Sequence, residues 1–136
     1  MFRQESMYWL TGYDTMGFVF FQCLILTVKG DLILLTRAPD LRQAQNTSII
    51  NDIRIWVDKD QSNPTDELKN ILSELSLEKS NLGVEYEAYG LTGRNAMRLN
   101  NSLKNFGTLH DKSELISQFR AVKSPSEIIY VKKAAE

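Results

Sequence analysis

The chain has 136 residues, a length that fits one globular domain. Its 16 Lys and Arg against 17 Asp and Glu leave a net charge of −1, without the basic excess typical of nucleic-acid binding, so we expect no nucleic-acid partner. Its longest apolar run, residues 18–26, is about half as long as a membrane-spanning helix, so we expect no membrane partner. The single cysteine, Cys23, excludes an internal disulfide, and we expect a cytoplasmic protein with Cys23 in its core.

Extended and helical patterns alternate along the chain. Alternating or continuous apolar residues predict strands over residues 18–26, 31–37, 52–58, 82–86 and 106–111. Apolar residues at helical spacing, or an opening proline, predict helices over residues 39–48, 64–75, 91–105, 113–122 and 125–136. This order predicts an α/β fold: a single three-layer domain with a mixed sheet of five or six strands between helices.

Two of the predicted helices begin with clear capping signals. Asn63-Pro64 and Ser124-Pro125 both place a capping side chain before a proline at the first helical position. Glu127 lies three residues after Ser124, as a capping box requires. Asp111 or Ser113 is expected to cap the helix over 113–122. The last helix carries no Gly, Asn or Pro stop signal.

The densest group of aromatic residues lies near the start of the chain, in "MYWLTGYDTMGF" (residues 7–18). We interpret this stretch as a loop after at most two residues of a strand. Such a loop can bury its aromatic side chains in its own core. It can instead present Tyr13, Met16 and Phe18 to a ligand or a partner subunit, because aromatic residues and Met are favoured at interfaces.

Catalytic patterns are scarce. His110 is the only histidine, and no cluster of His, Cys, Asp and Glu has the spacing of a metal site, so we expect no catalytic residue and no metal in this chain. Glu85 and Glu87 lie two residues apart and share a strand face. They could act as a paired acid and base, but a solvated strand face is the more common arrangement.

Three separated motifs resemble one known family. "YWLTGYD", "LGVEYEAYGLT" and "RAVKSPSEIIYVKKAAE" are similar, in order and spacing, to signatures in the amino-terminal domain of the creatinase/prolidase/aminopeptidase P family of pita-bread metallohydrolases. The resemblance covers nearly the whole chain. It implies a parent enzyme that hydrolyses C–N bonds with two divalent metal ions, held by two Asp, one His and two Glu of a separate C-terminal domain.

The resemblance also implies roles for this chain. It implies a non-catalytic domain that supports homodimer assembly and shapes the pocket for a small peptide or amide substrate. Tyr13, Asp14, Met16 and Phe18 would lie near the substrate in the parent dimer. Besides a second copy, the expected partner is the protein's own C-terminal catalytic domain. Alternatives are a peptide- or protein-binding module from an inactive relative, and a free-standing α/β domain.

The expected domain boundary follows from the same resemblance. Residues 1–123 would form the N-terminal domain, without its first helix and most of its first strand. Residues 124–136 would begin the linker helix to an absent catalytic domain, so we expect this helix to be exposed, frayed at its end or docked on another molecule.

Overall fold

A computed structural model describes all 136 residues. Its helices are α1 (Gln4–Thr11), α2 (Leu41–Thr47), α3 (Pro64–Glu74), α4 (Gly93–Ser102), α5 (Leu115–Ala121) and α6 (Pro125–Ala134). Its strands are β1 (Cys23–Leu26), β2 (Leu32–Arg37), β3 (Asp52–Trp56), β4 (Asn81–Val84) and β5 (Thr108–Asp111). Two short 3₁₀ helices, η1 (Gly17–Val19) and η2 (Ala38–Asp40), precede β1 and α2. The α/β class predicted from the sequence is confirmed.

The five strands form two sheets instead of the single sheet that we expected. One sheet has the order β1-β2-β3, with β2 antiparallel to β1 and parallel to β3. The other pairs β4 with β5 in parallel. The sheets remain separate because no strand lies between β1 and β4. On the edge of β1 that does not pair with β2, Met1 forms two backbone hydrogen bonds with Leu24.

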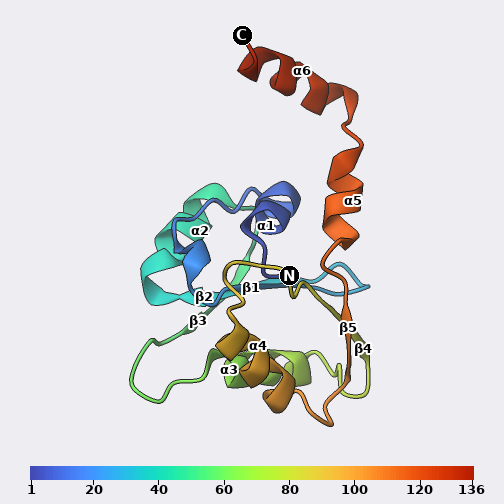
Figure 1. Cartoon of the computed structure of the whole chain (residues 1–136). Helices are drawn as coiled ribbons and strands as arrows, with labels where there is room; N and C mark the ends of the chain where they lie inside the picture. The colour runs from blue at the N-terminus through green and yellow to red at the C-terminus, as the bar shows by residue number, and fades with distance from the viewer.

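The three layers are confirmed, and strand alternation explains them. Successive side chains of β1 and β2 point to opposite faces, so one face joins a core of 15 buried residues and the other a core of six. The larger core lies against α3 and α4, and the smaller one against α1 and α2 (Figure 1). Both faces of the central strands are therefore covered, which explains their nearly continuous apolar sequence.

Local signals place most helix starts. The Asn63 side chain accepts a hydrogen bond from the Thr65 N–H, and Ser124 and Glu127 form both bonds of the predicted capping box. The predicted cap of α5 is wrong. α5 begins at Leu115 without a side-chain cap, because the Asp111 carboxylate instead accepts hydrogen bonds from the N–H and hydroxyl of Ser113.

The stretch that we interpreted as a loop is helical over Gln4–Thr11. This helix buries Ser6, Met7 and Thr11 and ends at Gly12, whose φ of +77° and N–H bond to the Tyr8 carbonyl form a left-handed cap. A side chain at Gly12 would also be too close to Thr47, since its Cβ would lie 2.8 Å from that backbone oxygen. The short helix was hard to foresee because it carries no N-capping side chain.

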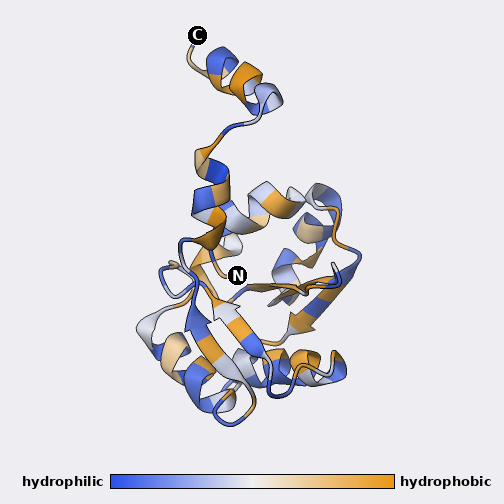
Figure 2. Cartoon of the chain, turned by 90° about the vertical axis from the view of Figure 1, so that its right-hand side faces the viewer, coloured by the Kyte–Doolittle hydropathy of each residue, from blue (hydrophilic) through white to orange (hydrophobic).

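The C-terminal helix α6 projects from the body of the molecule (Figure 1). None of its residues is buried, and exposure was one of the three outcomes that we expected for this helix. Figure 2 shows apolar and polar bands alternating along it. Ile129, Tyr130 and Val131 are more than half exposed. None of the six helices has the length and apolar character needed to cross a membrane.

Candidate functional site

The structure separates the four residues predicted to lie near a substrate. Tyr13 is fully buried between α1 and the sheet, with its hydroxyl 3.4 Å from Thr36 Oγ1. Burial raises the pKa of the Tyr13 phenol. Asp14 and Met16 are exposed, Met16 to 81%, and Phe18 is half-buried. Tyr13 thus anchors the segment, while the other three belong to the loop that follows.

Hydrogen bonds of Thr15 and close backbone packing at Gly17 and Gly90 hold that loop in place. The Thr15 hydroxyl donates a hydrogen bond to Asp40 and accepts one from the Gly17 N–H at 2.8 Å. Gly17 has no room for a side chain, since its Cβ would lie 2.5 Å from Asp40 Oδ1. On the other side, a Cβ at Gly90 would lie 2.8 Å from the Phe18 carbonyl oxygen. The loop is therefore packed tightly at both ends.

The outer side of the loop is apolar. We call Met16, Val19 and Phe20 the loop surface; these three side chains are 81%, 54% and 41% exposed. The Arg37 guanidinium lies over the Phe20 ring, 3.4 Å from its centroid, and is oriented by Asp40 at 3.3 Å. Phe, Met and Arg are residue types that are enriched at protein–protein interfaces.

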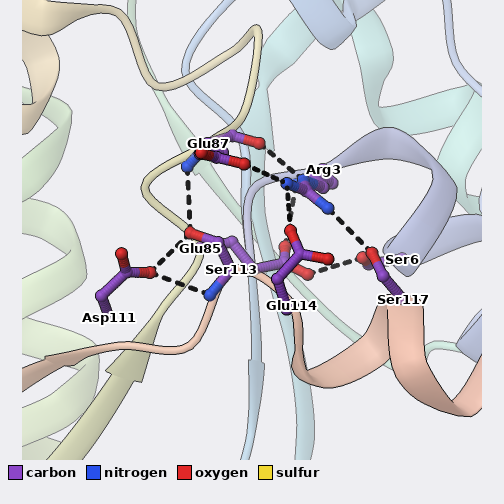
Figure 3. A network of polar contacts seen from close by, with 8 residues as sticks. All are labelled: Arg3, Ser6, Glu85, Glu87, Asp111, Ser113, Glu114 and Ser117. Carbon is purple, nitrogen blue, oxygen red and sulfur yellow. Dashed lines mark hydrogen bonds and ion pairs between the residues drawn. The ribbon is translucent and has the colours of Figure 1, made fainter.

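A second group of polar residues joins the start of α1 to the end of β4 (Figure 3). The buried Glu85 carboxylate accepts hydrogen bonds from the backbone N–H groups of Phe2 and Arg3, at 2.8 and 3.0 Å. It also accepts one from the Ser6 hydroxyl at 2.5 Å. Our expectation of a solvated face is wrong for Glu85, because α1 has no capping side chain of its own and Glu85 supplies the acceptor from a distance.

Arg3 extends this network to α5. Its guanidinium donates to Ser117 Oγ at 2.8 Å and pairs with Glu87 and Glu114 at 3.1 and 3.2 Å (Figure 3). Glu87 is exposed, as expected, and its backbone N–H donates to the Ser113 hydroxyl. Arg3 therefore ties three parts of the chain together: α1, the segment after β4, and the helix that leads to α6.

One further bond reaches α6 itself. The Trp9 indole N–H donates to Glu127 Oε1 at 3.0 Å. The pKa of the Glu127 carboxyl is lowered to about 2, first by the Ser124 backbone N–H, then by the Ser124 side chain and Trp9. Several large apolar side chains of α5 and α6 stay exposed and form what we call the junction face: Phe119, Val122, Ile128, Ile129, Tyr130 and Val131.

The chain's own side chains do not fit a metal-dependent active site. No group of three or more His, Cys, Asp and Glu residues is placed to hold a metal ion. His110 is exposed and lies 3.0 Å from the Asn81 side-chain oxygen. Cys23 is buried, and burial raises the pKa of its thiol, which disfavours the nucleophilic thiolate. The polar groups described above position helices, and we derive no hydrolytic step from them.

Arg3 and Trp9 were not singled out as candidate functional residues from the sequence, and Glu85 was considered only with Glu87 as a possible acid–base pair. The partners described above lie between 79 and 118 residues away along the chain, so no local spacing connects them. One signal was present: residues 1–5 contain no Ser, Thr, Asp or Asn to cap a helix, so a helix there needs a remote acceptor.

Comparison with known proteins places these observations in a family. A family model described as the Creatinase/Prolidase N-terminal domain matches residues 1–122. An ectoine hydrolase from Halomonas elongata is 28% identical over 139 aligned positions, which cover 97% of this chain and 35% of that protein. The chain thus spans about a third of the length of this relative.

Solved structures show the same fold. An X-Pro aminopeptidase from Thermotoga maritima superposes with a TM-score of 0.74 at 17% identity, over 98% of this chain and 34% of that one. An Xaa-Pro dipeptidase from Bacillus anthracis gives 0.72 at 18%, over 96% and 33%. A dipeptidase from Pyrococcus horikoshii gives 0.69 at 23%, over 93% and 33%. With the family match over residues 1–122, the chain belongs to the Creatinase/Prolidase N-terminal domain family.

Proposed function

We propose that this chain is the non-catalytic N-terminal domain of a metal-dependent C–N hydrolase of the Xaa-Pro dipeptidase or creatinase type. The observation that carries the proposal is the family match over residues 1–122. The chain aligns with about a third of the length of an ectoine hydrolase and of an Xaa-Pro dipeptidase. The two metal ions of the parent would be held by its C-terminal domain. We place the parent enzyme in the cytoplasm.

Within the parent, the domain would help to assemble a homodimer and to shape the pocket for a small peptide or amide. The loop surface supports this role, because it is apolar, exposed and held by tight contacts on both sides. Asp14 and Phe18 belong to the same loop, while Tyr13 would act from the core by fixing the start of the loop. The junction face would pack on the C-terminal catalytic domain.

Two measurements test the proposal. The purified chain should hydrolyse no Xaa-Pro dipeptide and retain no stoichiometric metal, while the full-length parent should do both. Peptidase activity with bound metal in the isolated chain would contradict it. Light scattering of the full-length protein should give a dimer, and Met16→Ala with Phe20→Ala should raise KM or weaken the dimer.

An alternative function is a peptide- or protein-binding module from an inactive relative. The same loop surface favours it, since an apolar patch can meet a protein as well as a substrate. The parent's downstream sequence separates the two proposals: two Asp, one His and two Glu in the family order favour the hydrolase, and their loss favours the binding module.

A further inference from the structure

Strand β3 forms an open edge of the three-stranded sheet. In the order β1-β2-β3 it pairs with β2 on one side and with no strand on the other (Figure 1). No backbone hydrogen bond outside the β2–β3 ladder involves residues 52–56, so every second N–H and C=O of β3 points outward without a partner in the chain. An edge of this kind is a template for pairing with another strand.

The two faces of β3 differ in character. Ile53 packs on the smaller core, beside α2, and strand alternation places the exposed Ile55 on the same face. Asp52 and Arg54 lie on the opposite face, where the Arg54 guanidinium binds Asp52 at 3.0 Å and Glu74 of α3 at 3.1 Å. The edge therefore carries an apolar row beside α2 and a pair of opposite charges beside α3.

A shallow groove lies beside the apolar row. It has a volume of about 350 Å³, and its lining includes Leu41 of α2 together with Ile49, Asn51 and Ile53. Ile49 is exposed at one end of this segment, and Val57 is exposed just after β3. The edge thus offers both an apolar groove and apolar side chains that protrude.

One register makes the charges of this edge complementary to themselves. When two β3 strands pair antiparallel about a two-fold axis through Ile53, residue 52 of each copy lies opposite residue 54 of the other. Asp52 then faces Arg54 twice, so four charges of alternating sign meet across the axis. An axis through Asp52 or Arg54 would instead place like charges opposite each other, which is unfavourable. The charges therefore select the register centred on Ile53.

The same register also matches the apolar features. Ile55 of one copy lies opposite Asn51 of the other, at the groove beside α2. Just beyond the strand ends, the exposed Ile49 lies opposite the exposed Val57. Because the charge pairs and the apolar pairs lie on opposite faces, they support the register independently. Charge pairs at a surface contribute little energy, so burial of apolar area would supply most of the affinity.

We propose that the outer edge of β3 binds β3 of a second copy of this chain, antiparallel and centred on Ile53, so that two three-stranded sheets join into one sheet of six strands. The α2 helices of both copies would lie on one face of the joined sheet and the α3 helices on the other. A contact along one strand edge is small, so the dimer should be weak and depend on concentration. The proposal assigns a surface distinct from the loop surface and the junction face, and it does not depend on the proposed hydrolase function.

Charge reversal tests the register. Sedimentation equilibrium of the unsubstituted chain should show a dimer that dissociates on dilution. Arg54→Asp and Asp52→Arg each place like charges opposite each other, so each should weaken self-association by about tenfold or more. When the two variants are mixed, association should return, because every charge then faces its opposite; its return also shows that both variants are folded. Arg94→Asp, the same change of charge at an exposed position of α4, is the control and should have no effect.

A disulfide measures the geometry at the axis. Ile53→Cys places a thiol opposite the same residue of the second copy, where the Cα atoms of paired residues are about 4.5–5.5 Å apart and a disulfide can form. Under mild oxidation this variant should give a covalent dimer faster than Ile55→Cys, although residue 55 is the more exposed of the two. Cys23 is buried, so it should stay out of the reaction.

Several results would overturn the proposal. These are a chain that stays monomeric at the highest soluble concentration, a dimer that both charge variants retain, and charge variants that do not associate when mixed. Faster cross-linking through residue 55 than through residue 53 would also overturn it, because the copies would then meet in another register or through another surface.

Discussion

Glu85 is expected to be the most important buried polar residue for stability. Its carboxylate satisfies two backbone N–H groups and one hydroxyl at the start of α1. Glu85→Ala would leave these donors without an acceptor in a buried place, so we expect a loss of about 3 kcal/mol in the free energy of unfolding. Urea denaturation measures this loss.

The neighbouring Glu87 provides the matched control at the same scale. Its side chain is 75% exposed, and its ion pair with Arg3 lies at the surface. Glu87→Ala should therefore cost less than about 1 kcal/mol. Equal losses for the two variants would show that Glu85 does not act as the cap of α1.

Tyr13 and Met16 should respond differently to truncation. Tyr13 is fully buried, so Tyr13→Ala should lower the free energy of unfolding by about 3 kcal/mol or more, through a cavity in the core between α1 and the sheet. Met16 is 81% exposed, so Met16→Ala should leave stability within about 0.5 kcal/mol. Thermal unfolding of both variants checks this. A stable Tyr13→Ala variant would contradict the core position.

At the residue scale, what the sequence could predict depended on how local the contacts are. The caps at Asn63 and Ser124 need only neighbours within three positions, so their spacing revealed them. Glu85 could not be predicted in the same way, since its partners are about 80 residues away. Tyr13 was correctly singled out as unusual, but sequence alone could not distinguish a buried anchor from an exposed contact.

At the scale of elements, helix α6 should be sensitive to acid at its start. Glu127 has a pKa of about 2 in the folded chain, below its ordinary value of 4.5. The stabilising contribution of its carboxylate is therefore present above about pH 4.5 and is lost as the pH falls through about 2. The Trp9 indole N–H resonance should shift over this range as its bond to Glu127 breaks.

The second tryptophan is an internal control for that titration. The Trp56 indole N–H donates to the Phe21 backbone carbonyl, which does not titrate, so its resonance should stay constant while the fold persists. Glu127→Gln should remove the acid-dependent shift of Trp9. If both resonances move together in the unsubstituted chain, the change reports global unfolding and the specific link between α1 and α6 is contradicted.

Elements with strong periodicity were easier to predict than those held by distant contacts. α3 and α4 bury Leu68, Ile71, Leu72 and Leu99 at helical spacing, and both helices appear where expected. β1 begins later than predicted, at Cys23, because residues 17–19 form a 3₁₀ turn that packs on Gly90. α1 was missed because its N-terminal acceptor belongs to another part of the chain.

At the scale of the whole molecule, the α/β class and the three layers followed from the order of strand and helix patterns. The division into two sheets did not, since strand pairing between segments far apart is a property of the whole fold and not of either segment. We expected α6 to be exposed, frayed or docked on another molecule, and it has no buried residue.

The predicted boundary at residues 123 and 124 can be tested by two truncations. Removing residues 124–136 takes away a helix without buried residues and one exposed hydrogen bond, so the free energy of unfolding should change by less than about 1 kcal/mol. Removing residues 114–136 also deletes buried Ile116 and the contacts of Arg3 with α5, and should cost about 3 kcal/mol. Urea denaturation of the three proteins compares them directly, and equal stability of the two truncated forms would place the boundary before α5.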